Sequence, residues 1–401
     1  MKEFLRLLKR EFKLFIANST LRSVFFVAPI LYAVLLGFVY KTGKVEDIPV
    51  LAVDRDNTPL SSQLLEMLSD NHTIKLIKYQ NEPQNIQDEL IRYGASAVVM
   101  IPRRFEADVL QKKYPELNVY TNTSNVLTAN FAAKAVQLTV GTFSAGVAIK
   151  GLQKTGMPAS KAATQYEPFK TNYITLFNTT SNYLIFMWPP MLAVVLQQVI
   201  LLAMAVSFAA EFQRGSFINE YYHMRRWALP TMLIKVIPIW VFSIFIVCIY
   251  YVMHILFKVP LPEGVLNFLL LTSFFVASSS MLGVFMSVLI PDALKATQVL
   301  MVLASPSFII SGFTWPLNAM PHAVQLLANI IPLTPFLQAF KILLIQKGSM
   351  ELTFPYLQHL MVLTILYTVL GWIVLKIKLW KMFRYLKAED IETKEEHHLI
   401  Q

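Results

Sequence analysis

Two carboxylates stand close together after an apolar run, where they could bind a divalent metal or act as an acid–base pair. Asp54 and Asp56 follow the run 48–53 and precede Asn57. No third carboxylate or histidine lies near them at the spacing of a calcium-binding loop. Asp and Asn also favour the turns that lead from a strand into a helix. We therefore interpret the pair as a turn-capping feature and predict no metal site in this chain.

Two histidines, His254 and His359, lie in apolar segments and could carry a proton there. Ion-coupled transporters usually hold an acidic or basic side chain within the membrane, but both histidines lie near the expected ends of apolar segments. We interpret them as interfacial residues. His397 and His398 belong to a charged C-terminal stretch, and we interpret them as tail residues rather than metal ligands.

The motifs of common enzyme chemistries are missing from the sequence. It contains no G-x-x-x-x-G-K-[ST] phosphate loop, no G-x-S-x-G, no H-E-x-x-H and no C-x-x-C. The single cysteine, Cys248, excludes a disulfide framework and a cysteine zinc site. We therefore expect no catalytic, cofactor-binding or metal-binding residue. If the chain moves a substrate, the free energy must come from a partner.

A compact set of charged groups follows a long apolar segment, in the stretch 211–220, EFQRGSFINE. Glu211, Arg214 and Glu220 offer charges of both signs to a partner surface, and Gly215 permits a tight turn. A short helix that docks in another protein's groove and a turn tucked under a helix bundle both fit this composition.

The elements that position these residues are apolar and long enough to cross a membrane. The chain is 55% hydrophobic and 15% charged, whereas a soluble domain carries about 25% charged residues. This composition excludes a disordered chain and disfavours a single soluble globule. A membrane-spanning helix needs about 20 apolar residues. The apolar windows predict six spans, at 21–41, 183–210, 235–257, 265–290, 295–311 and 354–377.

The stretch 296–340 carries no charge and is too long for one span. Its prolines and glycine interrupt it after the fifth span, so we predict a re-entrant segment at 312–340 that enters the membrane without crossing it. Irregular backbone at membrane depth must be shielded by protein or line a cavity. The interrupting residues include Gly312, Pro316, Pro321, Pro332 and Pro335.

The net charge of +10 indicates orientation rather than a nucleic-acid surface. Cytoplasmic segments are rich in Lys and Arg, and the short loops on the predicted outer side hold only Lys258, Lys341 and Lys347. No aromatic–basic motif of a nucleic-acid-binding domain is present, so we predict contact with membrane lipids and no nucleic acid. The predicted cytoplasmic segments are an amphipathic interfacial helix at 1–20, a coupling segment at 211–234 and a tail at 378–401.

Residues 42–182 form a polar insertion between the first two spans, predicted to be an extracytoplasmic α/β domain. Strand and helix patterns alternate from 48 to 120, which predicts a small mixed sheet backed by helices. A longer helical stretch, 125–154, could run toward the membrane as a stalk. The predicted fold class is a mainly α membrane protein: a six-helix bundle with a re-entrant segment after span five, plus this α/β domain.

Four segments together resemble the permease subunits of the ABC type-2 transporter family, in the branch with a large external domain between spans one and two. The stretch 210–216, AEFQRGS, is similar to the family's E-x-x-x-G-[ST] segment after the second span. The stretch 311–321, SGFTWPLNAMP, resembles its S-G-x-x-x-P-x-x-x-M-P motif, and 331–340 resembles the I-P-L-T-x-F motif. In the external domain, 119–125 resembles the family's strand followed by Ser-Asn.

The stretch after Ser216 departs from the family pattern. Pro230 and Lys235 stand where the family has a proline and then a lysine, but the family's usual continuation is T-x-E-x-L-x-x-[ST]-P. Here the stretch 217–222 reads FINEYY. The departure concerns the coupling contacts and leaves the order and spacing of the four segments intact.

The resemblance implies partners rather than an enzymatic activity of the chain itself. It implies ABC ATPase subunits, encoded separately and carrying ATP and Mg, and a second permease subunit, either identical or a paired paralogue. A periplasmic adaptor protein is a further partner of such systems. The implied location is the inner (plasma) membrane of a bacterium, with both termini cytoplasmic. The residues implied for ATPase coupling are Glu211, Arg214, Gly215 and Glu220, and those for the substrate path are Trp188, Pro189, Pro306 and Phe308. The resemblance also implies that the re-entrant segment 312–340 is an external gate segment, with the gate residues Gly312, Pro316, Pro321, Pro332 and Pro335.

The expected function is that of an ATP-driven exporter permease. Because the path would be apolar and aromatic, we expect a hydrophobic or amphiphilic substrate, such as a drug or lipid, to leave the cytoplasm or the inner leaflet. Two alternatives remain open at this point: a mechanotransmission or scaffold protein without a substrate path, and a membrane-anchored receptor that acts through its external domain.

Overall fold

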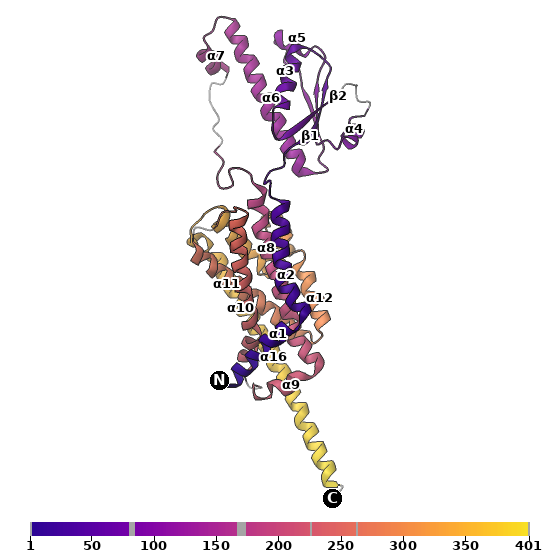
Figure 1. The fold of residues 1–401 in the computed structure, drawn as a ribbon, viewed down its shortest axis with the longest axis vertical. Coiled ribbons are helices and arrows are strands. Elements are labelled where there is room, and N and C mark those ends of the chain that lie inside the picture. The colour runs from indigo at the N-terminus through magenta and orange to yellow at the C-terminus, as the bar shows by residue number, and fades with distance from the viewer. Residues whose placement is uncertain (1, 80–84, 167–173, 225–226, 262–263, 400–401) are drawn as a thin grey trace. The chain divides into compact units, whose positions relative to one another are not determined.

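The chain folds into two compact units, and Figure 1 labels their elements. The bundle unit comprises Met1–Gly43 and Thr175–Gln401, and the sheet unit comprises Lys44–Ile174. The computed structural model describes residues 2–79, 85–166, 174–224, 227–261 and 264–399.

The sheet unit contains a four-stranded mixed sheet with the strand order β2-β1-β3-β4. The first three strands pair in parallel, and β4 pairs antiparallel to β3. The strands are β1 (Ile48–Asp54), β2 (Ile74–Tyr79), β3 (Ala97–Ile101) and β4 (Asn118–Thr121). The helices are α3 (Pro59–Ser69), α4 (Ile86–Arg92), α5 (Phe105–Leu110), α6 (Val126–Lys154) and α7 (Ala159–Tyr166). The predicted small mixed sheet is confirmed.

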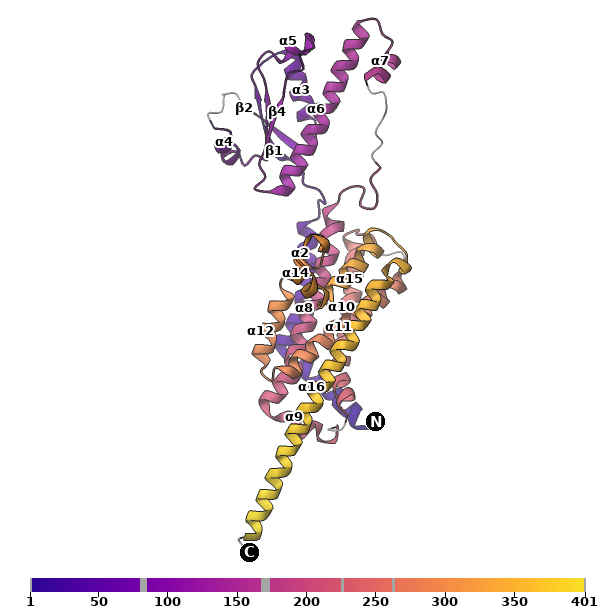
Figure 2. The ribbon, with the colours of Figure 1, turned by 180° about the vertical axis from the view of Figure 1, so that it is seen from behind.

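Alternate residues of β1 face opposite sides of the sheet, as the period of a strand requires. Val50 and Ala52 pack in the core that α3, α5 and α6 complete, while Leu51 and Val53 pack with Leu90 of α4. Both faces are therefore covered, which explains why β1 is apolar from Ile48 to Val53. Figure 2 shows α3 and α6 alongside the sheet with α4 apart from them.

Helix α6 is part of the sheet unit's core along its first half. Its buried residues include Ala132, Val136 and Phe143, which join the cluster built on β1 and β3. The predicted stalk at 125–154 is therefore a packed helix over this part, because its small alanines allow close approach to the sheet.

The sheet unit is shorter than the predicted segment 42–182. The carbonyl of Gly43 accepts a hydrogen bond from the Tyr183 amide, and the Asn182 side chain caps the next helix through the Leu184 amide at 2.8 Å. Gly43, Asn182 and Tyr183, which flank the insertion, therefore belong to the bundle unit. The sheet unit runs from Lys44 to Ile174.

The bundle unit consists of helices joined by turns and loops, with no strand among its described residues. Its long helices are α2 (Ser19–Val39), α8 (Tyr183–Arg214), α10 (Ala228–Leu256), α11 (Val265–Leu289) and α16 (Met350–Leu399). Its shorter helices are α1 (Lys2–Ala17), α9 (Ser216–Tyr221), α12 (Ala293–Ala304), α13 (Ser307–Ile310), α14 (His322–Asn329) and α15 (Leu333–Phe340). Single turns follow at η1 (Tyr222–Met224), η2 (Leu317–Ala319) and the π-helical η3 (Lys341–Ile345).

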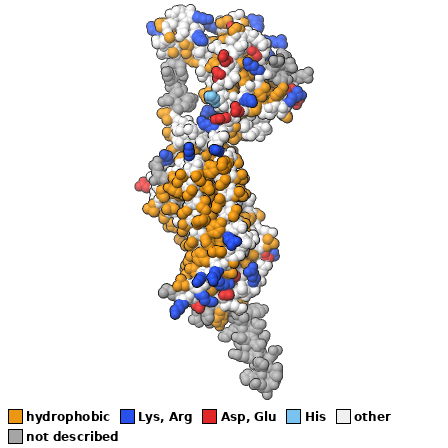
Figure 3. Space-filling view, viewed as in Figure 1, with side chains coloured by type: hydrophobic (Ala, Val, Ile, Leu, Met, Phe, Trp, Pro, Cys, Tyr) orange, Lys and Arg blue, Asp and Glu red, His pale blue; other side chains and the backbone are white. Residues whose placement is uncertain are grey.

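Six helices of the described residues are long and apolar enough to cross a membrane. Five are the long helices of the bundle unit, and the sixth is α6, which instead packs on the sheet. The fold class, a mainly helical membrane protein with a small sheet, is confirmed. Figure 3 shows a belt of hydrophobic side chains on one face of the bundle.

The predicted fifth span, 295–311, is not one continuous helix. It consists of α12 and α13, which are separated at Ser305 and Pro306. Proline has no amide hydrogen and its ring displaces the preceding turn, so a helix kinks or ends there. The gate segment that follows contains α14 and a helix over Leu333–Ile345, which meet at a bend of 87°. Such a bend belongs to a broken span or a re-entrant loop.

Helix α8 is the centre of the bundle unit, with buried residues along nearly its whole length. The pair Pro189 and Pro190 lies inside this helix without ending it. Close packing against α11 is made possible by Gly283, where a Cβ would lie 2.4 Å from the Met204 Cβ. The hydroxyl of Ser287 then donates to the Ala205 carbonyl of α8 at 2.8 Å.

The predicted boundaries of the coupling segment and the predicted start of the tail fall inside helices. Helix α8 continues to Arg214 and α10 begins at Ala228, so both enter the predicted coupling segment 211–234. Helix α16 runs without a break from Met350 to Leu399, through the predicted boundary between span 354–377 and tail 378–401. Charged residues that end a membrane span need not end a helix, because they favour helical backbone themselves. Arg225 and Arg226 of the coupling segment lie outside the described residues.

Candidate functional site

Five charged side chains from four helices meet at one end of the bundle, and we call this group the ion cluster. Its members are Arg10 and Glu11 of α1, Glu211 of α8, Glu220 of α9 and Lys235 of α10. Charges separated by up to 225 positions in the sequence thus form one network. Figure 1 shows α1 and α9 at the same end of the bundle, and we call this the α9 end.

Arg10 binds the carboxylates of three neighbours. Its Nη1 lies 2.7 Å from Glu211 Oε1 and 2.8 Å from Glu11 Oε1, and its Nε lies 3.5 Å from Glu220 Oε2. A guanidinium presents several N–H donors in a rigid plane, which suits it to joining several carboxylates. Although burial opposes the charged form, the hydrogen bond and charge of Glu211 raise the pKa of Arg10 above its ordinary value. Arg10 is therefore a fixed positive charge that links α1, α8 and α9.

Lys235 is the most deeply buried charge of the cluster. Only 3% of the residue is exposed, and its Nζ lies 2.9 Å from Glu211 Oε2 and 3.0 Å from Glu11 Oε1. The ammonium also lies above the rings of Phe208 and Tyr221, at 5.7 and 5.4 Å from their centres. A buried charge is tolerated only when it is paired, so Lys235 and the two carboxylates depend on one another.

Tyr221 of α9 forms a further hydrogen bond with the ion cluster. Its hydroxyl donates a hydrogen bond of 2.9 Å to Glu11 Oε1, and its ring stacks on Phe217 at 4.8 Å between ring centres. Burial and the nearby carboxylates raise the pKa of Tyr221 well above its ordinary value. The phenol therefore stays protonated as a donor at all physiological pH values.

Local sequence features bring these side chains together. In α1 the apolar residues Leu7 and Phe15 are buried, and the ring of Phe15 packs against Phe242 of α10 at 4.7 Å. Gly215 ends α8 with φ of 68°, in the left-handed region that glycine adopts at little cost. The turn at Gly215 reverses the chain so that α9 places Phe217 and Tyr221 beneath the bundle.

The four residues predicted for coupling occupy different environments. Glu211 is buried and paired inside the chain, Glu220 is half-buried at the edge of the cluster, and Arg214 and Gly215 are exposed. The ion cluster also contains Arg10, Glu11 and Lys235, which were not predicted as site residues. A signal was present: Glu11 is one of only two acids on a basic amphipathic helix, and Lys235 begins a strongly apolar segment.

Among the predicted gate residues, Gly312 lies in a tight turn that contacts η2 and α15. Gly312 has φ of 80°, and a Cβ there would lie 2.4 Å from Leu317 Cγ and 2.7 Å from Gln338 Nε2. The amide of Gln338 donates to the Ser311 carbonyl at 2.8 Å, which connects α15 to the end of α13. Pro332 and Pro335 are buried in the first turn of α15, whereas Pro316 and Pro321 are exposed.

The four residues predicted for a substrate path occupy different environments. Trp188 is fully buried and donates its indole N–H to the Ala33 carbonyl at 2.8 Å, and Phe308 is buried against Phe313. Pro306 is exposed. Pro189 alone of the four lines one of the described cavities.

The Asp54 and Asp56 carboxylates organise the turn between β1 and α3. Asp54 Oδ2 accepts from the Ser61 hydroxyl at 2.7 Å and its Oδ1 accepts from the Asp56 amide at 3.0 Å. Asp56 Oδ2 accepts from the Thr58 hydroxyl at 2.6 Å and the Glu106 amide at 2.9 Å. Burial opposes ionisation, but these hydrogen bonds outweigh it and lower the pKa of Asp56. Among the described residues, no group of three potential ligands could hold a metal ion.

Asp54→Ala is expected to destabilise this turn by about 1–3 kcal/mol, because the Asp56 and Asn57 amides lose the carboxylate oxygen that accepts from them and the Ser61 hydroxyl loses its acceptor at 2.7 Å. Hydrogen exchange of the α3 amides in the full chain measures the loss. Asp70→Ala, an exposed acid at the other end of α3, is the control and should leave exchange unchanged. Protection of wild-type α3 should also be insensitive to EDTA and should fall only in acid, as the pH drops below 3.8 through the lowered pKa of Asp56. Loss of protection with EDTA at neutral pH would contradict the capping role.

Comparisons with known proteins identify related chains. Residues 19–376 match the model of a family described as ABC-2 family transporter protein. The chain is 23% identical over 339 residues to ABC transporter G family member 20 of Dictyostelium discoideum. The similar region covers 81% of this chain and 44% of that protein, so the chain spans less than half of this relative's length.

Proposed function

Because the chain belongs to the ABC-2 transporter family, we propose that it is the membrane subunit of an ATP-driven exporter and that the ion cluster couples it to separate ATPase subunits. ATP and Mg would be bound by those partners. The observation that carries the proposal is the position of Arg10, which joins α1 to both α8 and α9. A force applied to either short helix would reach the central helix of the bundle through charged contacts of 2.7–3.5 Å.

The surface beside the ion cluster suits a partner protein. Trp227 is 64% exposed and Tyr222 is 46% exposed, and the exposed Arg214 lies at the start of the same segment. Aromatic and arginine side chains are enriched in protein–protein contacts. In this proposal Arg214 and Glu220 meet the ATPase, while Glu211 holds α8 to α1 and α10 behind them.

The basic residues at the α9 end of the bundle also indicate how the chain is oriented in the membrane. Figure 3 shows lysines and arginines gathered over the α9 end, below the hydrophobic belt. A basic excess marks the cytoplasmic side, so the proposal places the ion cluster and both termini in the cytoplasm and residues 42–182 outside. A bacterial inner membrane, a second permease subunit and a periplasmic adaptor complete the proposed assembly, and the cargo is a hydrophobic or amphiphilic compound such as a drug or lipid.

Arg10→Ala is expected to uncouple the chain from its ATPase while leaving their association intact. Removing the guanidinium breaks the connection of α1 to α8 and α9, and a typical coupling free energy of about 1–3 kcal/mol corresponds to roughly a fivefold or larger loss of response. The measurement is the stimulation of ATP hydrolysis by a hydrophobic compound in liposomes, alongside co-purification of the ATPase.

Arg6→Ala provides the matched control for this variant. Arg6 lies on the same helix, is exposed, and pairs with Glu3 at 2.8 Å, a surface contact worth little. Normal stimulation in Arg6→Ala and lost stimulation in Arg10→Ala support the proposal. Equal stimulation of ATP hydrolysis in both variants would show that the ion cluster does not couple the chain to its ATPase.

The second candidate function is mechanotransmission, in which the chain passes force to the sheet unit without transporting a substrate. We call this function force relay. It is favoured by the internal packing of Trp188 and Phe308, two residues predicted to line a path. The two functions differ in one assay. Transport of at least one hydrophobic compound from a broad panel, driven by ATP in liposomes, supports export, whereas ATP-dependent movement of the sheet unit without transport supports relay.

A further inference from the structure

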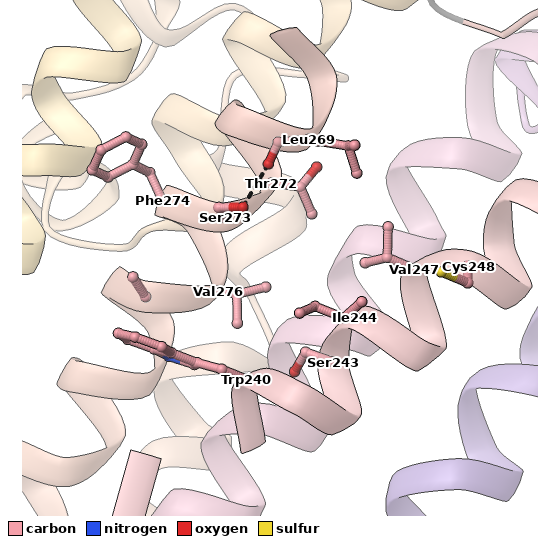
Figure 4. A pocket seen from close by; sticks show the side chains of 11 residues that line it. Trp240, Ser243, Ile244, Val247, Cys248, Leu269, Thr272, Ser273, Phe274 and Val276 are labelled. Atoms are coloured by element: carbon pink, nitrogen blue, oxygen red, sulfur yellow. Dashed lines mark hydrogen bonds between the residues drawn. The ribbon is translucent and has the colours of Figure 1, made fainter. Parts of the chain in front are cut away.

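Two neighbouring cavities lie between α10 and α11, on the outside of the bundle. The first has a volume of about 340 Å³ and is shown in Figure 4. The second has a volume of about 390 Å³ and also borders α8 and α15. Both share Val247, Cys248, Leu269 and Thr272 in their walls. We call the two together the α10–α11 groove. Each is within the size range of small-molecule pockets, roughly 300–1,000 Å³.

The groove contains buried polar atoms that have no hydrogen-bond partner in the described structure. They are Nε1 of Trp240 and Oγ of Ser243 in the first cavity, and the Tyr250 hydroxyl in the second. Ser243 is 1% exposed and Tyr250 is 7% exposed. A buried donor without an acceptor costs about 1–3 kcal/mol, so three in one groove indicate that something else supplies acceptors.

Other hydroxyls of the same walls are satisfied by their own helix. Ser273 donates to the Leu269 carbonyl at 2.7 Å, drawn as a dashed line in Figure 4, and Thr272 donates to the Phe268 carbonyl at 2.8 Å. This back-bonding is the usual state of a serine or threonine inside a helix. Ser243 is therefore distinguished from Ser273 by its free hydroxyl, although both line the same cavity.

The walls define the chemistry of an occupant. No Lys, Arg, Asp or Glu lines either cavity, so a charged group would enter without a counter-charge at great cost. A water molecule needs 2–4 polar partners, which these largely apolar walls do not gather at one point. An apolar molecule with acceptor oxygens meets both conditions.

The groove is open toward the side of the bundle that lipid would cover. Its rim carries exposed apolar side chains: Ile244 is 64% exposed, Val252 is 52% exposed and Leu269 is 46% exposed. In a membrane these residues border hydrocarbon, so an occupant enters sideways from the bilayer. The groove requires no partner subunit and is built from residues outside the ion cluster.

We propose that the α10–α11 groove binds an uncharged amphiphile from the bilayer, of the monoacylglycerol type. The ester and hydroxyl oxygens of an occupant accept hydrogen bonds from Trp240 and Ser243 in the first cavity or from Tyr250 in the second, and its hydrocarbon chain lies against the apolar walls that both cavities share. This site is distinct from the proposed coupling route and does not depend on ATP.

Photo-labelling of the full chain in phosphatidylcholine nanodiscs tests the site. The probe is a monoacylglycerol that carries a diazirine in its acyl chain, and labelled peptides are mapped by mass spectrometry. Labelling is expected to concentrate on residues 240–254 and 265–277 and to be displaced by excess mono-oleoylglycerol but not by oleate, which is anionic. Labelling spread evenly over the lipid-facing helices, or equal displacement by oleate, would overturn the proposal.

Paired serine variants test the role of the free hydroxyl. Ser243→Ala removes an unpartnered donor and should reduce site-specific labelling about two- to tenfold, the value of one hydrogen bond. Ser273→Ala removes a hydroxyl already satisfied by its own helix and should leave labelling unchanged. Tyr250→Phe repeats the first test in the second cavity without changing the aromatic ring. Thermal unfolding of each variant verifies the fold, and equal labelling in Ser243→Ala and Ser273→Ala refutes the assignment.

Discussion

Lys235→Met is expected to lower the free energy of unfolding of the purified chain by about 3–5 kcal/mol, the cost of removing one partner of a buried ion pair. Glu11 and Glu211 both lie within 3.0 Å of the Lys235 ammonium. Without it, three carboxylates of the ion cluster share the single guanidinium of Arg10. Methionine preserves most of the apolar volume of the side chain, so the loss reports the missing charge. Reversible unfolding in a denaturing detergent measures it.

Two further variants make this expectation specific. Lys295→Met removes an exposed lysine of α12 and should change stability by less than about 0.5 kcal/mol, as is usual for surface substitutions. Adding Glu211→Gln to Lys235→Met removes one of the stranded negative charges and should restore part of the loss. A double variant that is no more stable than Lys235→Met alone would show that the buried lysine does not act through Glu211.

Gly312→Ala is expected to destabilise the gate segment by about 2–4 kcal/mol, from two causes that add. A non-glycine residue with φ of 80° is strained by about 1 kcal/mol or more. Its Cβ would also meet Leu317 Cγ at 2.4 Å, and such overpacking costs about 1–3 kcal/mol. Hydrogen exchange of the amides between α13 and η2 should rise accordingly, and transport should fall if this turn gates the path.

Gly215→Ala separates the two causes. Gly215 has a similar φ of 68°, but no atom lies within 4 Å of the position of its Cβ. This variant should therefore show the backbone strain alone, about 1 kcal/mol. Equal losses in Gly312→Ala and Gly215→Ala would mean that the contacts of Gly312 with α15 and η2 contribute nothing to the turn.

The sequence predicted those features that depend on local pattern. The apolar run 48–53 and the succession of strand and helix patterns from 48 to 120 are local features, and they led to the small mixed sheet. The long apolar windows likewise correspond to α2, α8, α10, α11 and α16. Helix boundaries were less predictable: Pro306 interrupts its helix, whereas Pro189 does not. Neighbouring helices decide whether a proline is accommodated, and a single sequence does not contain that information.

The candidate site was predicted only in part, for a physical reason. Glu211 and Glu220 were recognisable as charges beside a glycine turn, and as part of a family-like motif. Their partners Arg10 and Lys235 lie on other helices, and their pairing depends on how α1 crosses the bundle. A prediction from charge alone placed Glu211 on a surface, while packing encloses it with only 7% of the residue exposed.

The sequence by itself determined that this protein is a membrane bundle with a separate sheet unit, because hydropathy and strand alternation act over a few turns or one strand. It also determined the set of charges available at the α9 end. Tertiary structure alone decided which of those charges are buried, and which hydroxyls lack partners in the α10–α11 groove. Pairing energies and desolvation depend on distances of about 3 Å between residues far apart in the chain, and only the packed helices establish those distances.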